Sequence, residues 1–274
     1  MGSNLRPCRT VRCAVVGHVE WVESVLVDRV PGAGEIAHGA EDWSEPAGGG
    51  GVAAAQLLKL AGACDFFTAL GDDERGRRAE ERFRELGIAT DVEWFGSTRR
   101  AFVQVDAHGE RTITTVGPKL RRRELPPMDR YDAVFFVAGE VSALRAARAA
   151  RFVSATPREL PTLLEGAVRL DLLVGSGTDP GERYDGGLDV ALVVKTEGVR
   201  GGVANGRRYE PASPPAPIAD TYGAGDSFGA ALTFALGRGD EPEDALVLAA
   251  RAGAAVITGK GPYIAQLELD AHLG

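Results

Sequence analysis

The residues best suited to chemistry lie in one short glycine-rich segment, which runs from Asp220 to Phe228. Gly223 and Gly225 let backbone amides converge where a helix begins, and the positive end of the helix dipole favours a transferring phosphoryl group. Asp226 falls in the first predicted turn of that helix, within reach of an attacking hydroxyl. The spacing therefore predicts an anion hole beside a carboxylate base. Taken alone, such a carboxylate equally suits a simple charge partner of the helix dipole.

The rest of the chain predicts the elements that would hold this segment. Short apolar runs alternate with longer helical patterns, which indicates an α/β fold with a doubly wound, mostly parallel sheet and helices on both faces. The expected strands are 13–16, 66–70, 133–137, 170–174 and 191–195. The expected helices are 52–61, 74–86, 144–152, 160–168, 224–236 and 243–258.

Two segments interrupt this alternation and predict a small antiparallel β lid. Residues 24–30 with 34–39, and 101–106 with 111–116, have the pattern of paired strands. The lid would span about 22–42 and 99–117 of a single domain covering residues 1–274. Because its strand edges and apolar face need a partner, we expect the lid to close over substrate or to form a homodimer.

The glycine-rich segment closely resembles the C-terminal signature of the ribokinase-like (PfkB) carbohydrate kinase family. Further motifs of that family occur in its order: Gly17, 28–35, Gly48–Gly51, 71–76, 100–106, 109–112 and Thr196–Gly202. The resemblance implies an enzyme that uses ATP and Mg²⁺ to phosphorylate a hydroxyl of a small sugar or nucleoside.

The resemblance also implies roles for individual residues. Asp226 would be the base, and the anion hole would be formed by the amides of Gly223, Ala224 and Gly225. The ATP site would include Thr196, Gly198 and Gly201. Magnesium would be organised by Asp179, with Ser176 where the family has Asn. A monovalent cation such as K⁺ would be held by Asp220 and by backbone carbonyls near Tyr222, Val256, Gly259 and Gly261.

The substrate positions depart from the family pattern. Ala53 stands where the family has a sugar-binding Asn, and Val22 where it has an Asp. The expected substrate residues are Glu20, Gly48, Gly49, Arg100 and Glu140. Arg99 and Arg100 would suit a phosphate or carboxylate on the substrate, although paired surface arginines are commonly only solvated. The acceptor therefore stays open among a pentose, a hexose phosphate and a nucleoside.

Composition limits the partners. A formal charge of −8 and a pI near 5.2 argue against nucleic acid as a partner. No apolar run approaches the roughly 20 residues that span a bilayer. Cys8, Cys13 and Cys64 lack the spacing of a metal or disulfide framework, which predicts reduced thiols in a cytoplasmic protein.

Three other readings fit less well. A dinucleotide-dependent oxidoreductase would need the glycine cluster Gly48–Gly51 to follow a strand, and Glu45-Pro46 predicts none there. A P-loop ATPase lacks its G-x-x-x-x-G-K-[ST] motif. A catalytically weak sugar- or nucleoside-sensing binder agrees with Ala53 and Val22 but not with the intact Asp226.

Overall fold

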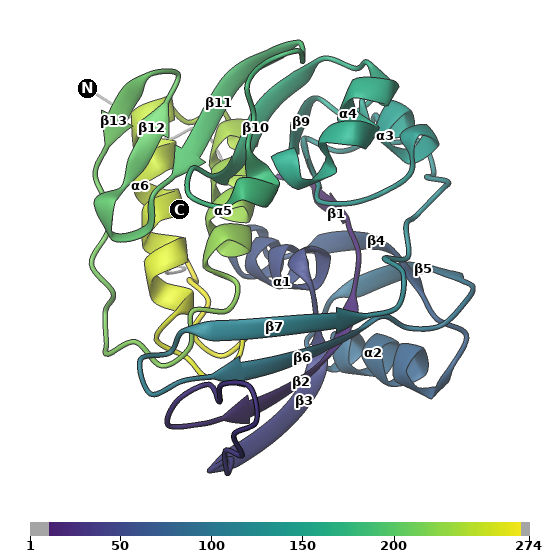
Figure 1. The fold of residues 1–274 in the computed structure, drawn as a ribbon. Helices are drawn as coiled ribbons and strands as arrows, with labels where there is room; N and C mark the ends of the chain where they lie inside the picture. Colours follow the sequence, from purple (N-terminus) through teal and green to yellow (C-terminus); the bar gives the residue numbers. More distant parts are fainter. Residues whose placement is uncertain (1–10, 270–274) are drawn as a thin grey trace.

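The computed structural model describes residues 11–269 and confirms a mostly parallel sheet (Figure 1). Nine strands lie in the order β13-β12-β11-β10-β9-β8-β1-β4-β5. The last seven in this order, from β11 to β5, are parallel to one another, whereas β12 and β13 pair in the antiparallel direction. Their bounds are β1 Cys13–Val16, β4 Cys64–Leu70, β5 Ala89–Trp94, β8 Ala133–Phe136, β9 Phe152–Ala155, β10 Leu170–Ser176, β11 Val190–Thr196, β12 Gly202–Ala204 and β13 Arg207–Tyr209.

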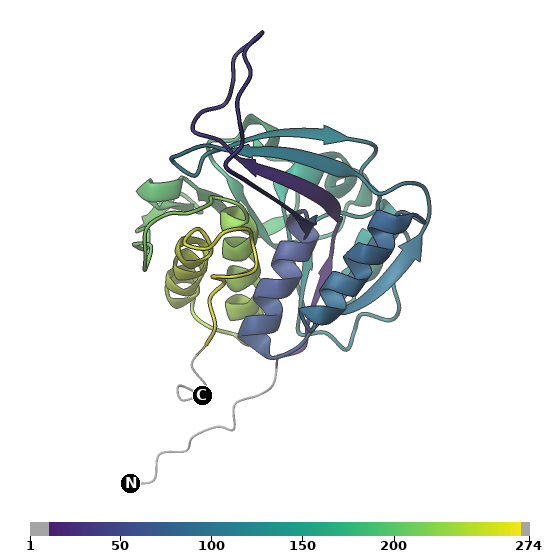
Figure 2. The same ribbon diagram turned by 90° about the horizontal axis from the view of Figure 1, so that it is seen from below.

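Helices cover both faces of this sheet, because its strands are apolar on both sides. On one face, Cys13 and Val15 of β1 join the core under α1 (Gly49–Ala61), α2 (Glu74–Glu85), α5 (Ala224–Arg238) and α6 (Pro242–Val256). Figure 2 shows these four helices as one layer. On the other face, Ala14 and Val16 join the core under α3 (Val141–Ala147) and α4 (Leu160–Gly166).

A second sheet of four strands forms the lid. Its order is β3 (Glu41–Ala47), β2 (Glu20–Leu26), β6 (Arg100–Val105) and β7 (Arg111–Val116). The lid is mixed rather than antiparallel, because β2 and β6 are parallel. Each leaves the main sheet after a parallel strand, β1 or β5, and so enters the lid in the same direction.

Several predicted boundaries are wrong. Residues 34–39 form an exposed loop, and β2 pairs with β3 instead. This loop is rich in glycine, which disfavours a strand, whereas the edge strand β3 tolerates Pro46. The helix expected over 144–152 ends at Ala147, and Phe152 begins β9. Strands β3, β5, β9, β12 and β13 were not predicted.

Cys13 and Cys64 lie opposite each other on neighbouring strands as free, buried thiols, and Cys8 lies outside the described residues. Within residues 11–269, every helix is too short or too polar to cross a bilayer.

Candidate active site

A cleft of about 530 Å³ lies between the lid and the carboxyl ends of the parallel strands. Its floor is formed by His18, Gly48, Gly49 and residues 221–226. Its lid side is formed by Glu20, Arg99, Arg111, Ile113, Thr115 and Lys119. Its sheet side includes Thr156, Arg158, Ser176, Asp179, Glu182 and Thr196. These three groups come from segments that are far apart in the chain.

Two helix N-termini meet at the floor. Gly223 adopts φ 86° as the N-cap of α5, and Gly48 adopts φ 84° as the N-cap of α1, conformations that favour glycine. The backbone N–H of Gly48 donates to the hydroxyl of Tyr222 at 3.1 Å, which ties the two helix starts together. A Cβ on Gly49 would lie 2.7 Å from Oδ1 of Asp226, so only glycine leaves room for that carboxylate.

Asp226 is half-buried in the first turn of α5. Burial raises its pKa to about 6, and the charge of Glu182 adds to the rise, whereas Arg111 and Arg158 oppose it. A carboxylate with this pKa is still mostly ionised at pH 7, and it is a stronger base than an ordinary aspartate. The floor thus holds a suitable proton acceptor beside the amides of a helix N-terminus.

The lid side carries three cations and one carboxylate. Glu20 is 8% exposed, and its Oε1 lies 2.9 Å from Nε of Arg99. Burial raises the pKa of Glu20, although Arg99 and Lys119 oppose that rise. Arg99 also donates from Nη2 to Thr115 at 2.8 Å. His18, at the adjoining floor, has its pKa lowered well below the usual range by burial and by these nearby cations.

Arg111 connects the lid to the catalytic segment. Its Nε donates to the hydroxyl of Thr221 at 3.3 Å, and its guanidinium carbon lies 4.5 Å from the centroid of the Tyr222 ring. Since the hydroxyl of Thr221 also donates to the carbonyl of Gly109 at 3.0 Å, the β6–β7 turn is joined to the start of α5. The lid and the floor are therefore in direct contact at this point.

The sheet side has the opposite charge balance. Arg158 pairs with both Asp179 and Glu182, at 2.5 Å and 2.8 Å. Glu182 also accepts a hydrogen bond from the backbone N–H of Ser176 at 2.6 Å. The backbone N–H of Gly181 and the Arg158 guanidinium lower the pKa of Asp179. Two carboxylates and one guanidinium leave this side negative.

Asp220 joins two loops behind the floor. Its carboxylate is 3% exposed and accepts hydrogen bonds from the N–H of Tyr222 at 2.9 Å and of Gly261 at 3.1 Å. The loop of Gly261 follows α6, where the N–H of Gly259 donates to the carbonyl of Val256 at 3.2 Å. Within residues 11–269, Asp220 forms no ion pair. It is a buried carboxylate that the described side chains leave uncompensated.

The structure brings most of the predicted site residues together. The cleft is lined by Glu20, Gly48, Gly49, Asp179, Thr196, Tyr222, Gly223, Ala224, Gly225 and Asp226. Gly198 and Gly201 form the tight turn after Thr196 but do not line the cleft. Val22 and Ala53 are packed in the core and do not line it either.

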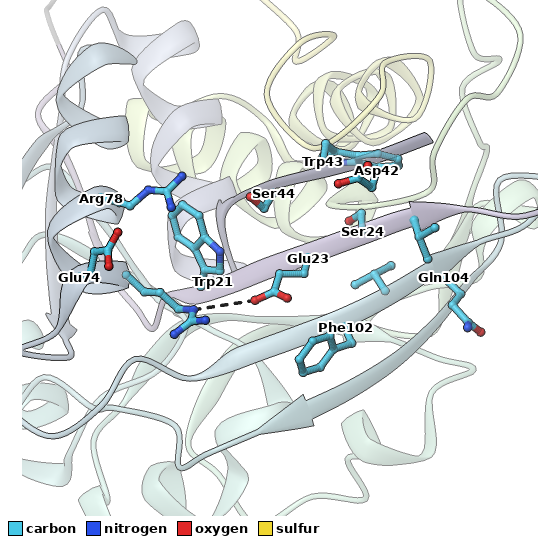
Figure 3. Close-up of a pocket in the computed structure, with 13 residues that line it drawn as sticks. Trp21, Glu23, Ser24, Asp42, Trp43, Ser44, Glu74, Arg78, Phe102 and Gln104 are labelled. Atoms are coloured by element: carbon cyan, nitrogen blue, oxygen red, sulfur yellow. Dashed lines mark ion pairs between the residues drawn. The ribbon is translucent and has the colours of Figure 1, made fainter. Parts of the chain in front are cut away.

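Arg100 and Glu140 do not line the cleft, contrary to expectation. Side chains alternate along β6, so Arg100 points to the outer face of the lid, where its Nη2 pairs with Glu23 at 2.9 Å. Glu140 is exposed as the N-cap of α3. Figure 3 shows the outer face, where Glu23 also pairs with Arg75, at 3.8 Å, near Trp21 and Phe102. A second hollow of about 620 Å³ lies there.

Sequence reasoning missed Arg111, Lys119, Arg158 and Glu182. Arg158 follows β9, and the sequence predicted no strand there, because residues 153–159 lie between the expected helices 144–152 and 160–168. Glu182 lies three residues after the predicted Asp179, and its carboxylate could have been assigned to magnesium on the same grounds. The expectation that no strand precedes Gly48 was also wrong, because β3 does. However, β3 is an antiparallel lid strand, so a dinucleotide-binding unit still does not form.

Comparison with known proteins agrees with this fold. The chain is 26% identical over 260 residues to aminoimidazole riboside kinase of Salmonella typhimurium, covering 76% of this chain and 81% of that protein. The ribokinase structure from Thermotoga maritima has a TM-score of 0.74 at 21% identity, covering 94% of this chain and 96% of that one. Arabidopsis thaliana ribokinase, solved with ribose and ATP, has a TM-score of 0.72 at 22% identity, covering 95% and 96%.

The family assignment follows from a match along most of the chain. The model of the pfkB family carbohydrate kinases matches residues 11–160 and 186–268. These ranges include the lid, the glycine cluster, the floor and the loop after α6. The chain therefore belongs to the pfkB family of carbohydrate kinases.

Proposed function

We propose that this kinase moves the γ-phosphoryl group of ATP onto a hydroxyl of a small sugar or sugar-like molecule, with Asp226 as the base. The observation that carries the proposal is the half-buried Asp226 carboxylate, next to the amides at the start of α5 and facing a cleft. Phosphoryl transfer needs positioning and charge stabilisation more than covalent chemistry, and this floor offers both.

In the proposed step, Asp226 accepts the proton of the attacking hydroxyl. The hydroxyl oxygen forms a bond to the γ-phosphorus, the bond from that phosphorus to the bridging oxygen breaks, and ADP leaves with the electron pair. The amides of Gly223, Ala224 and Gly225 would stabilise the negative charge that develops on the transferring group. A pKa of about 6 keeps Asp226 mostly ionised at neutral pH and lets it compete for the proton.

ATP is proposed to bind along the sheet side. Thr196 lines the cleft there, and Gly198 and Gly201, with φ of 60° and 76°, shape the turn that follows it. Support comes from the related Arabidopsis ribokinase, which was solved with ATP. Glycine at these positions would let the nucleotide approach the backbone closely.

The sheet side also suits magnesium that arrives with ATP. Asp179 and Glu182 supply carboxylate oxygens, the ligand type that Mg²⁺ prefers, but both already pair with Arg158. No group of three or more metal-ligating side chains occurs within residues 11–269. Magnesium would therefore be held mainly by the ATP phosphates, with Asp179 and Glu182 acting through its water ligands, and would neutralise phosphate charge.

Asp220 is proposed to hold a monovalent cation such as K⁺, together with carbonyls near Tyr222, Val256, Gly259 and Gly261. A buried carboxylate is costly without a compensating charge, and Asp220 has no ion-pair partner in the described part of the chain. A cation beside it would stiffen the two loops that it joins. One of those loops leads directly into the proposed anion hole, so rigidity there favours transfer.

A nucleoside acceptor is the second candidate, because the relative from Salmonella typhimurium is an aminoimidazole riboside kinase. A panel of pentoses, hexoses, sugar phosphates and nucleosides, assayed for ADP release with Mg²⁺, tests both candidates. We expect turnover of at least one acceptor class and loss of that turnover when Mg²⁺ is chelated. ATP binding without turnover of any acceptor would favour the third candidate, a sensing binder that lost catalysis.

The outer face of the lid is proposed as a homodimer contact. Phe102 is 36% exposed there, and Val116 is 50% exposed. Joining two such faces would cover apolar area that one chain leaves in water. Sedimentation at micromolar concentration should give twice the chain mass, and Phe102→Glu should give the single mass. A monomeric parent protein would rule out this contact.

A further inference from the structure

The lid side of the cleft is rich in hydrogen-bond donors and poor in free acceptors. Arg99, Arg111 and Lys119 line it, with Glu20 as the only carboxylate among residues 11–269. The hydroxyl protons of a neutral sugar need acceptors, and Glu20 already faces Arg99 at 2.9 Å. The family positions that would otherwise supply acceptors are Val22 and Ala53 here, both packed in the core. This side is therefore poorly matched to a neutral polyol.

Two cations on this side could form more hydrogen bonds or ion pairs than they do with the described residues. Arg99 is buried except for 19% of its side chain, and among residues 11–269 its guanidinium makes one aligned hydrogen bond, to Thr115. Lys119 is 16% exposed and contacts Glu159 at 2.9 Å. That fully buried carboxylate is shared with Arg121, so two cations face one negative charge.

Two buried polar atoms next to this side lack an aligned hydrogen bond among the described residues. His18 lies at the floor next to Glu20 and is 8% exposed. Its Nδ1 is buried and has no hydrogen-bond partner among the described residues. Nε of Arg99 is likewise buried without an aligned hydrogen bond, although it lies 2.9 Å from Oε1 of Glu20. Both atoms are enclosed by the protein, so a ligand in the cleft would contact Arg99 and Lys119 through the side-chain atoms that line it.

We propose that the phosphoryl acceptor carries an anionic group, a phosphate or a carboxylate, that binds between Arg99 and Lys119 beside His18. Both groups present several acceptor oxygens and no obligatory donor, and a guanidinium bonds either of them in a bidentate manner. The ionised group would sit away from Asp179 and Glu182 on the sheet side, where ATP is proposed to bind together with Mg²⁺, whose charge would offset the carboxylates. The charge division of the cleft thus orients the acceptor, with its hydroxyl toward Asp226. This inference rests on the proposed kinase function.

Matched acceptor pairs test the inference. Each pair contains a neutral sugar and its phosphate ester, or a neutral sugar and the corresponding sugar acid, so that the two anion sources are compared separately. We expect kcat/KM for one anionic member to exceed that of its neutral partner by about 10²-fold, the size of a pair of charge-assisted hydrogen bonds. Arg99→Gln or Lys119→Gln should lower this ratio about tenfold or more, mainly through KM.

Arg100→Gln is the matched control, because Arg100 is the next residue but lies on the outer face. It should leave the ratio unchanged. Since Arg99→Gln leaves Glu20 as an unpaired buried charge and risks misfolding, Glu20→Gln/Arg99→Gln removes both charges together. It should fold and still lose the preference for the anion.

The possible failures are distinguishable. If neutral sugars are phosphorylated as efficiently as both kinds of anionic partner, the kinase function stands and this inference is overturned. If no acceptor is phosphorylated, the proposed function fails, and calorimetric binding of the same pairs decides the inference separately. Tighter binding of an anionic member, lost in Lys119→Gln, would then support it, and equal binding would overturn it.

Discussion

The floor and the lid side of the cleft are built in different ways. Gly223, Gly225 and Asp226 of the floor come from one continuous segment, in which local backbone geometry sets where the amides and the carboxylate lie. On the lid side, Glu20, Arg99 and Lys119 come from three separate segments, which the two sheets bring together. The geometry of this floor segment is therefore set locally, whereas that of the lid side depends on how the two sheets meet.

Asp226→Asn should separate the two regions most sharply. Loss of the base is expected to lower kcat by about 10²–10⁴-fold, with little change in ATP affinity or in acceptor affinity. Steady-state kinetics would measure kcat, and calorimetry would measure the affinities for ATP and for the acceptor. Asp129→Asn, at an exposed carboxylate far along the chain, is the control and should retain full activity. Normal turnover by Asp226→Asn would remove Asp226 from the mechanism.

Gly49→Ala should disturb the floor without removing any reacting group. The added Cβ would lie 2.7 Å from Oδ1 of Asp226 and 2.8 Å from Cγ1 of Val137, so the carboxylate must move. A displacement of this kind is expected to lower kcat by roughly 10–10²-fold. Gly32→Ala, at a loop glycine whose added Cβ meets nothing closer than 3.5 Å, is the control. Equal kcat in Gly49→Ala and the parent protein would mean that the position of Asp226 is not critical.

The difference between the floor and the lid side also explains which parts of the site the sequence could predict. The floor was predictable because Gly223, Gly225 and Asp226 lie within one turn, and glycine at these positions indicates the local backbone geometry. The parallel sheet was predictable from apolar runs such as β1 and β4. The lid side was not, because whether Arg99 or Arg100 faces the cleft depends on the register of β6 against β2. A shift of one residue exchanges the two faces, and the only local signal is the alternation of Ala101, Val103 and Val105, which was not used to place Arg99.

Asp220→Asn should weaken the connection behind the floor. The carboxylate accepts from the N–H groups of Tyr222 and Gly261, and an amide can accept from only one of them while its NH₂ faces the other. We expect the free energy of unfolding to fall by about 1–3 kcal/mol in urea titrations, together with the loss of any activation by K⁺ over tetramethylammonium. A variant that responds to K⁺ as the parent does would exclude Asp220 from a cation site.

The smallest expected effect concerns stability, and it has the opposite sign from the effect on activity. The folded-state pKa of Asp226, about 6, lies above its ordinary value of 3.8, so the native state holds the proton more tightly than the unfolded state. Stability from this group is therefore present below about pH 4 and is lost as pH rises toward 6. Since Asn cannot ionise, Asp226→Asn avoids this loss. At pH 7.5 the free energy of unfolding of the variant should exceed that of the parent by on the order of 1 kcal/mol. The difference stays this small because water in the cleft screens part of the Asp226 charge. At pH 4 the difference should disappear. Urea titrations at both pH values measure it, with Asp129→Asn as the matched substitution at an exposed site. An equal difference at both pH values would mean that burial of the Asp226 charge does not set its pKa.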